Sequence, residues 1–107
     1  MDQSRIDFLR ESLGSDPDNA FLHYALAMEF VNAGRNQEAW QEFEHLLTHL
    51  PDYAATYYQA GKLLVRLGRN AYARQVLSAG IEVTRKQGNL HAQSELEAAL
   101  EELPIAD

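Results

Sequence analysis

The stretch NAGRNQEAW, residues 32–40, contains a short pattern that the chain repeats in RLGRNAYAR, residues 66–74. Both copies read G-R-N-x-x-A, and the second, at Gly68, begins 34 residues after the first, at Gly34. Glycine adopts a positive φ without steric cost, so it commonly closes a helix. The asparagine of each copy is expected to accept a hydrogen bond from a free N–H group at the start of the next helix. The pattern therefore predicts a helix–turn–helix unit that occurs twice.

The segments beside each turn carry apolar residues three and four positions apart, which is typical of amphipathic helices. The first copy shows this spacing at Leu22, Leu26, Phe30, Ala39, Phe43 and Leu46, and the second at Ala60, Leu64, Ala73, Leu77 and Ile81. No segment alternates apolar and polar residues as a half-buried strand would. A period of this length is typical of helical repeat proteins, so the predicted fold class is all-α.

The repeat resembles the tetratricopeptide repeat (TPR) family, whose 34-residue signature is W-x2-L-G-x2-Y, then A-x3-F, then P. These positions hold His23, Leu26, Ala27, Phe30, Ala39, Phe43 and Pro51 in the first repeat, and Tyr57, Ala60, Gly61, Leu64, Ala73, Leu77 and Arg85 in the second. The small and aromatic residues fit the signature, whereas His23, Ala60 and Arg85 depart from it. Because Arg85 replaces the proline that would stop the helix, we expect this helix to continue to Gly88.

The resemblance covers nearly the whole chain and implies a single domain, 1–107, built as an α-solenoid of antiparallel helix pairs. About six helices are expected: a half-repeat helix at 1–15, a repeat at 18–51, a second at 52–87 and a capping helix at 89–103. The half-repeat helix presents Ile6, Phe8, Leu9 and Leu13 as its apolar residues, and the capping helix presents Leu96, Ala99, Leu100 and Leu103. Asn89 is expected to cap that last helix.

Composition and net charge exclude several classes of site and partner. The 107 residues carry a formal net charge of −7 and include no cysteine. Cysteine-ligated zinc, thiolate chemistry and disulfides are therefore excluded, and a reducing, cytoplasmic location is expected. A negatively charged surface repels phosphate backbones, so no nucleic-acid partner is expected. No apolar run approaches the roughly 20 residues of a membrane span, and the N-terminal MDQSRIDFLR has no apolar signal core, so no membrane association is expected.

Catalytic and cofactor motifs are absent from the sequence, which has no P-loop, dinucleotide fingerprint, nucleophile elbow or HExxH. We therefore expect no enzyme activity and no cofactor. Glu42, His45 and His49 share one helix face at metal-ligand spacing. We expect this face to be exposed to solvent, opposite the core, and expect no metal site there, because three side chains without supporting partners rarely make one.

The family resemblance also implies that the first helix of each pair lines a concave surface that binds protein or peptide partners. The residues expected on this surface are Phe21, Tyr24, Met28, Val31, Tyr58, Gln59, Lys62, Val65 and Arg66. Tyr24 and Tyr58 lie one period apart and are expected side by side; the alternative is that these residues pack against flanking helices. Two roles are open for Lys62 and Arg66: holding a partner's carboxylate, or pairing within the chain with Glu29 or Glu95.

The function expected from these observations is a non-catalytic protein–protein interaction module that binds a peptide or helix on its concave surface. The alternative is a structural subunit that self-associates, in which case its partner is a second copy of the chain. Such contacts would use the repeat ends or aromatic residues that do not fall cleanly on the core stripe, namely Trp40 and Tyr72. Fold alone does not separate these two functions, because one fold serves many unrelated roles.

Overall fold

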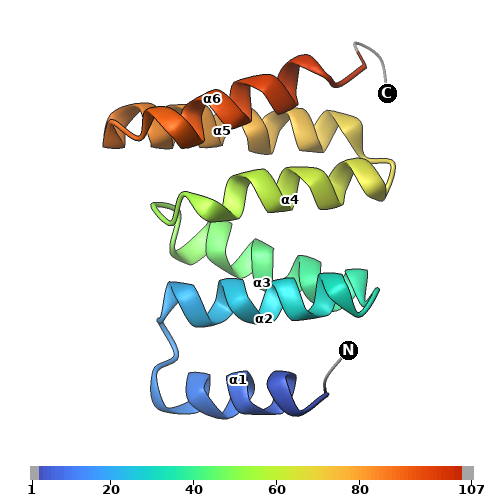
Figure 1. Cartoon of the computed structure of the whole chain (residues 1–107), viewed down its shortest axis with the longest axis vertical. Helices are drawn as coiled ribbons and strands as arrows, with labels where there is room; N and C mark the ends of the chain where they lie inside the picture. The colour runs from blue at the N-terminus through green and yellow to red at the C-terminus, as the bar shows by residue number, and fades with distance from the viewer. Residues whose placement is uncertain (1–2, 105–107) are drawn as a thin grey trace. The chain divides into compact units, whose positions relative to one another are not determined.

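The computed structural model describes residues 3–104, and this part of the chain contains six α-helices and no strand. The helices are α1 (Gln3–Ser15), α2 (Ala20–Asn32), α3 (Asn36–His49), α4 (Ala55–Arg66), α5 (Asn70–Gln87) and α6 (Leu90–Glu101). Within each of the two units described below, successive helices run in opposite directions (Figure 1). The predicted all-α helical repeat fold is confirmed. The chain divides between Tyr53 and Ala54 into two compact units, each of three helices, and the expected single domain with its repeat boundaries stays a prediction.

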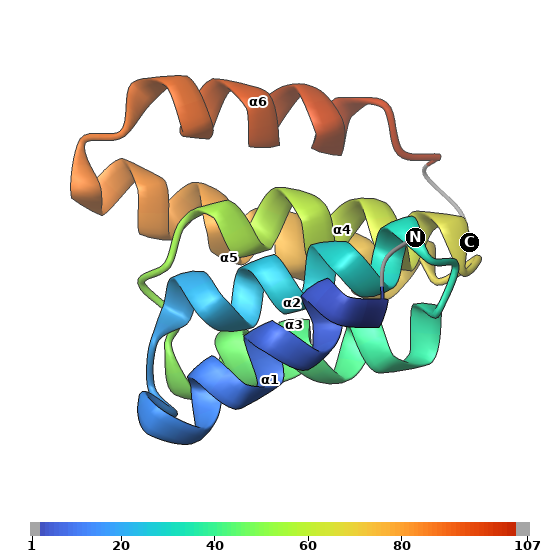
Figure 2. The ribbon, with the colours of Figure 1, turned by 60° about the horizontal axis from the view of Figure 1, so that its bottom comes forward.

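The first unit is centred on α2, which packs against both α1 and α3 (Figure 2). Its buried apolar residues are Ile6, Leu26, Ala27, Phe30, Ala39, Phe43 and Leu46. Phe8 was expected among the core residues of α1, but its side chain is 67% exposed. The reason is geometric: two residues turn a helix by about 200°, so Phe8 and the fully buried Ile6 face opposite sides.

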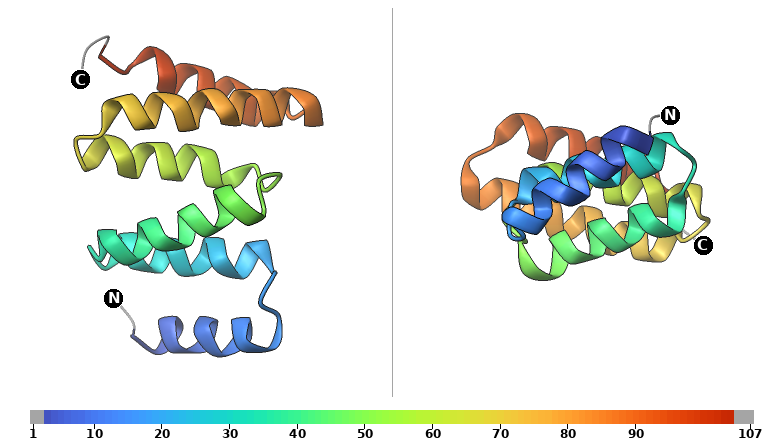
Figure 3. Two further views of the ribbon diagram at one scale, coloured as in Figure 1. Left: turned by 180° about the vertical axis from the view of Figure 1, so that it is seen from behind. Right: turned by 90° about the horizontal axis from the view of Figure 1, so that it is seen from below.

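The second unit is centred on α5, which packs against α4 and α6, while α4 also contacts α6 (Figure 3). Its buried apolar residues are Tyr57, Ala60, Leu63, Leu64, Ala73, Val76, Leu77 and Leu96. Gly80 of α5 lies close to both α4 and α6. A Cβ atom there would lie 2.5 Å from the Cβ of Tyr57 and 3.0 Å from a methyl group of Leu96. The absence of a side chain at this position therefore permits the packing.

The two G-R-N turns have the same backbone structure. Gly34 and Gly68 have φ angles of 73° and 77°, as predicted for residues that close a helix. The N–H of the arginine after each glycine donates to a carbonyl five residues earlier, at 2.9 Å in the first copy and 2.8 Å in the second. The glycine N–H donates to the carbonyl three residues earlier in both copies. This pair of bonds is the Schellman motif, which satisfies the last carbonyl groups of the helix.

The expected capping role of the two turn asparagines is wrong. Asn36 and Asn70 are the first helical residues of α3 and α5, and the preceding arginines occupy the capping positions without a side-chain cap. The Oδ1 atoms of both asparagines are buried and have no hydrogen-bond partner among residues 3–104. Asn89 behaves differently because it directly follows its helix-closing glycine: it caps α6 and accepts a hydrogen bond from the N–H of Ala92 at 3.2 Å. The intervening arginine therefore shifts Asn36 and Asn70 one residue too far.

Helix α5 continues past Arg85, as predicted from the missing proline. It has 18 residues and ends at Gly88, whose φ is 69°. The cationic Arg85 and Lys86 lie in its last turn, where they complement the helix dipole.

Candidate functional site

The second unit contains a hollow of about 540 Å³ between α4 and α6, which we call the α4–α6 groove. Four residues expected on the concave surface line it from α4: Tyr58, Lys62, Val65 and Arg66. The opposite wall includes Ala99, Glu102, Leu103 and Pro104, and the floor includes Gly61 and Leu77. The groove therefore combines an apolar floor and a largely apolar wall with two cationic side chains and the carboxylate of Glu102.

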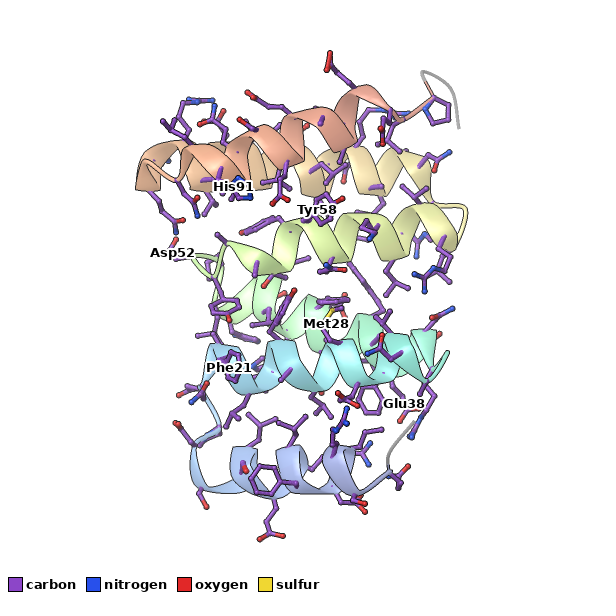
Figure 4. The ribbon with its side chains drawn as sticks, viewed as in Figure 1. Phe21, Met28, Glu38, Asp52, Tyr58 and His91 are labelled. Atoms are coloured by element: carbon purple, nitrogen blue, oxygen red, sulfur yellow. The ribbon has the colours of Figure 1, made fainter. Side chains whose placement is uncertain are left out.

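The α4 side chains lie on one face because they are three or four residues apart. Tyr58 is half-buried, on the α4 helix (Figure 4), and the Lys62 ammonium lies 5.3 Å from the centre of its ring. This cation–π contact holds the lysine stem along the helix. Val65 remains 41% exposed, so apolar surface is available beside the charges. Gln59, also expected on this surface, is half-buried and does not line the groove.

The two groove cations have no ion-pair partner within the described residues. The acids proposed as internal partners are engaged elsewhere: Glu29 pairs with Arg5 at 3.5 Å, and Glu95 lies 3.7 Å from the His91 ring nitrogen. Glu102 lines the same groove without an ion pair to Lys62 or Arg66. The cationic groups of Lys62 and Arg66 are therefore available to a ligand.

The α6 wall was not recognised as part of the site from the sequence. Ala99 of α6 and Leu103, just after its end, were expected only as part of the apolar stripe of the capping helix and not on the binding surface. The structure shows that the stripe also faces the groove and that the chain after α6 is tied to α5, because Arg74 donates to the carbonyl of Pro104 at 2.7 Å. The predicted length of the capping helix could have indicated this wall, because a helix of that length packed beside α4 borders the same surface as α4.

The first unit carries the other expected surface residues, all on α2. Phe21 is 62% exposed, whereas Tyr24, Met28 and Val31 are half-buried; Phe21 and Met28 are labelled in Figure 4. The Tyr24 ring packs against Tyr53 of the same unit, with 5.7 Å between ring centroids. The expected side-by-side placement of Tyr24 and Tyr58 joins residues of different units and stays a prediction.

The expected exposure of the Glu42–His45–His49 face holds for His49, but Glu42 and His45 are half-buried because His23 of α2 covers part of the face. The His23 and His45 ring centroids are 4.3 Å apart, and the His45 and His49 ring centroids are 4.8 Å apart. We call His23, His45 and His49 the histidine stack. Burial lowers the pKa of His45, and the neighbouring His23 and His49 lower it further, although Glu42 and Asp18 oppose this.

The hydrogen bonds of His23 explain why this cluster is unsuited to a metal ion. Its Nδ1 lies 2.8 Å from Glu42 Oε1, and its Nε2 lies 2.7 Å from the carbonyl oxygen of Pro17, so both nitrogens are occupied. The Nε2 atom of His45 is buried. No group of three metal-ligating side chains in residues 3–104 has the arrangement needed to hold an ion.

Two further observations bear on the function class. Over the same described range, no helix combines the length and apolar character needed to cross a bilayer. Trp40 and Tyr72, expected as exposed contact residues, are half-buried, and the Arg69 guanidinium lies 5.3 Å from the Tyr72 ring centre.

We compared the sequence and the fold with those of known proteins. No family model matches the chain. A TPR repeat-containing protein of Pseudomonas aeruginosa is 28% identical over 101 residues, covering 94% of this chain and 96% of that protein. A protein of Bordetella parapertussis, 24% identical with a TM-score of 0.76, covers 90% of this chain and 84% of its own and supports the fold alone.

A tetratricopeptide repeat domain protein of Salinibacter ruber is more similar in sequence. Its crystal structure is 40% identical, with a TM-score of 0.74, over 78% of this chain and 92% of that chain. Its solution structure gives 37% identity and a TM-score of 0.80 over 85% of this chain and 92% of that chain. The helix–turn–helix period, the all-α repeat fold and these similarities agree, and the chain belongs to the tetratricopeptide repeat family.

Proposed function

We propose that this protein is a non-catalytic, cytoplasmic interaction module that binds a peptide or helix of a partner protein in the α4–α6 groove. TPR proteins generally mediate protein–protein interactions, which supports the class of function. The observation that carries the proposal for this chain is the groove itself. It places two cations without ion-pair partners beside exposed apolar surface, among the described residues of the second unit.

The chemistry of the groove favours a segment that carries a carboxylate next to an apolar side chain. Lys62 and Arg66 are one helical turn apart, so both can donate to one carboxylate, either a side chain or a C-terminus. Val65 and Leu103 would cover the apolar neighbour. The net charge of −7 repels acidic partners in general. The cationic pair of Lys62 and Arg66 would therefore direct an acidic segment to the groove.

The α2 surface of the first unit extends the proposal. Phe21 offers a large exposed ring, and Met28 offers an adaptable apolar side chain seven residues, or two helical turns, further along the same face. We infer that Phe21, Tyr24, Met28 and Val31 contact further residues of a bound partner. Gln59 would contribute hydrogen bonds beside Tyr58.

The test uses peptides selected from a display library with free C-termini. The double variant Lys62→Ala, Arg66→Ala should lower the affinity of a selected peptide about tenfold or more, because it removes charge-assisted hydrogen bonds. The matched control is Arg85→Ala, Lys86→Ala, which removes the same charge from the end of α5. Equal losses in both double variants, or none in either, would contradict binding at the groove. An amidated copy of the peptide distinguishes a C-terminal carboxylate from an acidic side chain.

Self-association is the second candidate, and the exposed ring of Phe8 on α1 favours it. A second copy could cover this ring at the end of the repeat array. Light scattering over a range of concentrations should then show a mass above 12.1 kDa that falls in Phe8→Ser and persists in Phe21→Ser. A constant monomer mass for the unsubstituted protein excludes this function.

A further inference from the structure

The histidine stack joins α2 to α3 through three imidazole rings. His23 comes from α2, and His45 and His49 come from α3, one turn apart. The ring centroids of His23 and His45 are 4.3 Å apart, with 33° between the ring planes. Contact at this distance makes the charge of one ring depend on the charge of the other.

The hydrogen bonds of the stack differ between its two inner rings. Both nitrogens of His23 face acceptor oxygens, those of Glu42 and Pro17, and only a doubly protonated ring can donate to both. The Nε2 atom of His45 is buried and has no partner among the described residues. A proton on that atom would therefore lack an acceptor and would lie beside a second imidazole ring.

We propose that the packed α2–α3 pair accommodates one positive charge in the histidine stack, on His23, and that a second proton, on His45, loosens α2 from α3. The titratable groups that face His45 are His23 from α2, Glu42 and His49 from α3, and Asp18 from the turn before α2. Glu42 is already bound to His23, so its carboxylate is shared rather than free to compensate a second charge.

The direction of the pH dependence follows from the environment of His45. Burial, His23 and His49 lower the pKa of His45 below its usual value of 6.5. As the pH falls below about 6.5, the unfolded chain takes up this proton before the folded chain does. The stabilisation that depends on uncharged His45 is therefore complete above about pH 6.5. The free energy of unfolding decreases as the pH falls from there through the lowered pKa of His45. The α2 surface, with Phe21 and Met28, would shift with the loosened helix.

The first test is an NMR titration of the four histidine rings in the intact protein. The His45 signal should titrate below the ordinary histidine pKa of 6.5, and amide signals of α2 and α3 should change with it. Titration of His45 at or above that value, or without a change in the amides of α2 and α3, would overturn the proposal. This measurement needs no substitution, so it holds even where a variant fails to fold.

The second test compares thermal unfolding at about pH 7.5 and about pH 5.5. His45→Phe keeps an aromatic ring in the stack but removes its proton-binding nitrogens. The acid-induced decrease in Tm should therefore be at most about half of that in the unsubstituted protein. His91→Phe, made at a histidine of α6 (Figure 4), should keep the decrease seen without substitution. A full decrease in His45→Phe would overturn the proposal.

Discussion

The two G-R-N turns share one backbone but use their arginines differently. In the first, the Arg35 guanidinium binds Glu38 through two hydrogen bonds, of 2.6 and 2.7 Å, and lies 4.9 Å from the Phe30 ring centre. In the second, the Arg69 guanidinium lies 5.3 Å from the Tyr72 ring centre and has no ion pair among the described residues. Glu38 and Tyr72 occupy equivalent positions of the repeat. The residue at this position therefore decides whether the turn arginine has an ion-pair partner.

The same comparison extends to the helix packing of the two units. Positions Ala27 and Leu46 of the first repeat correspond to Gly61 and Gly80 of the second. The first unit fills these places with side chains, both of which are buried, whereas the second brings helices together at glycines. The repeat thus conserves its turns in structure while each unit uses a different means of packing. The predictions below test that difference.

The largest effect is expected for Gly80→Ala. The added Cβ would lie 2.5 Å from the Cβ of Tyr57, an atom close to the backbone that cannot move freely. Overpacking of this kind costs about 1–3 kcal/mol of unfolding free energy, measured by urea denaturation. The control is Gly14→Ala in α1, where an added Cβ would meet no neighbouring helix within 4 Å and a gain of about 0.5–1 kcal/mol is expected from helix propensity. A stability unchanged in Gly80→Ala would contradict the close-packing account of the second unit.

A smaller and equal effect is expected for Gly34→Ala and Gly68→Ala. Each glycine has a positive φ with open space around its Cα, so the cost comes from backbone strain alone. We expect each variant to lose about 1 kcal/mol of unfolding free energy. Both can be measured in the same urea series. Clearly unequal losses would mean that the two turns do not share one conformation in solution.

The smallest effect separates the two arginines. Arg35→Ala removes the Glu38 ion pair and should lower the urea midpoint, whereas Arg69→Ala should lower it less. The hydrogen bond from Arg35 lowers the pKa of Glu38, so this pair stabilises above the ordinary glutamate pKa and the contribution is lost as the pH falls through the lowered value. The difference between the two variants should therefore shrink in acid. A difference that persists or grows in acid would contradict the ion-pair explanation.

Local features were predictable from the sequence, and features that depend on neighbouring helices were not. Gly34 and Gly68 determine their turns through their own backbone freedom, and Arg85 lets α5 continue without any tertiary contact. The exposure of His45 was mispredicted because His23 of another helix covers it. The α6 wall of the groove was missed for the same reason, since Leu103 faces α4 only once three helices have packed. The capping role predicted for Asn36 and Asn70 was wrong because each asparagine lies one residue past the capping position.

The central claim, that the α4–α6 groove binds the partner, is tested most directly by amide chemical-shift mapping with a peptide selected by display. The account predicts that the largest shifts occur at Tyr58, Lys62, Val65 and Arg66 on α4 and at Ala99 and Leu103 on the opposite wall. Smaller shifts are expected on the α2 surface around Phe21. Shifts confined to α1, α3 or the outer face of α5, with the groove amides unchanged, would contradict it.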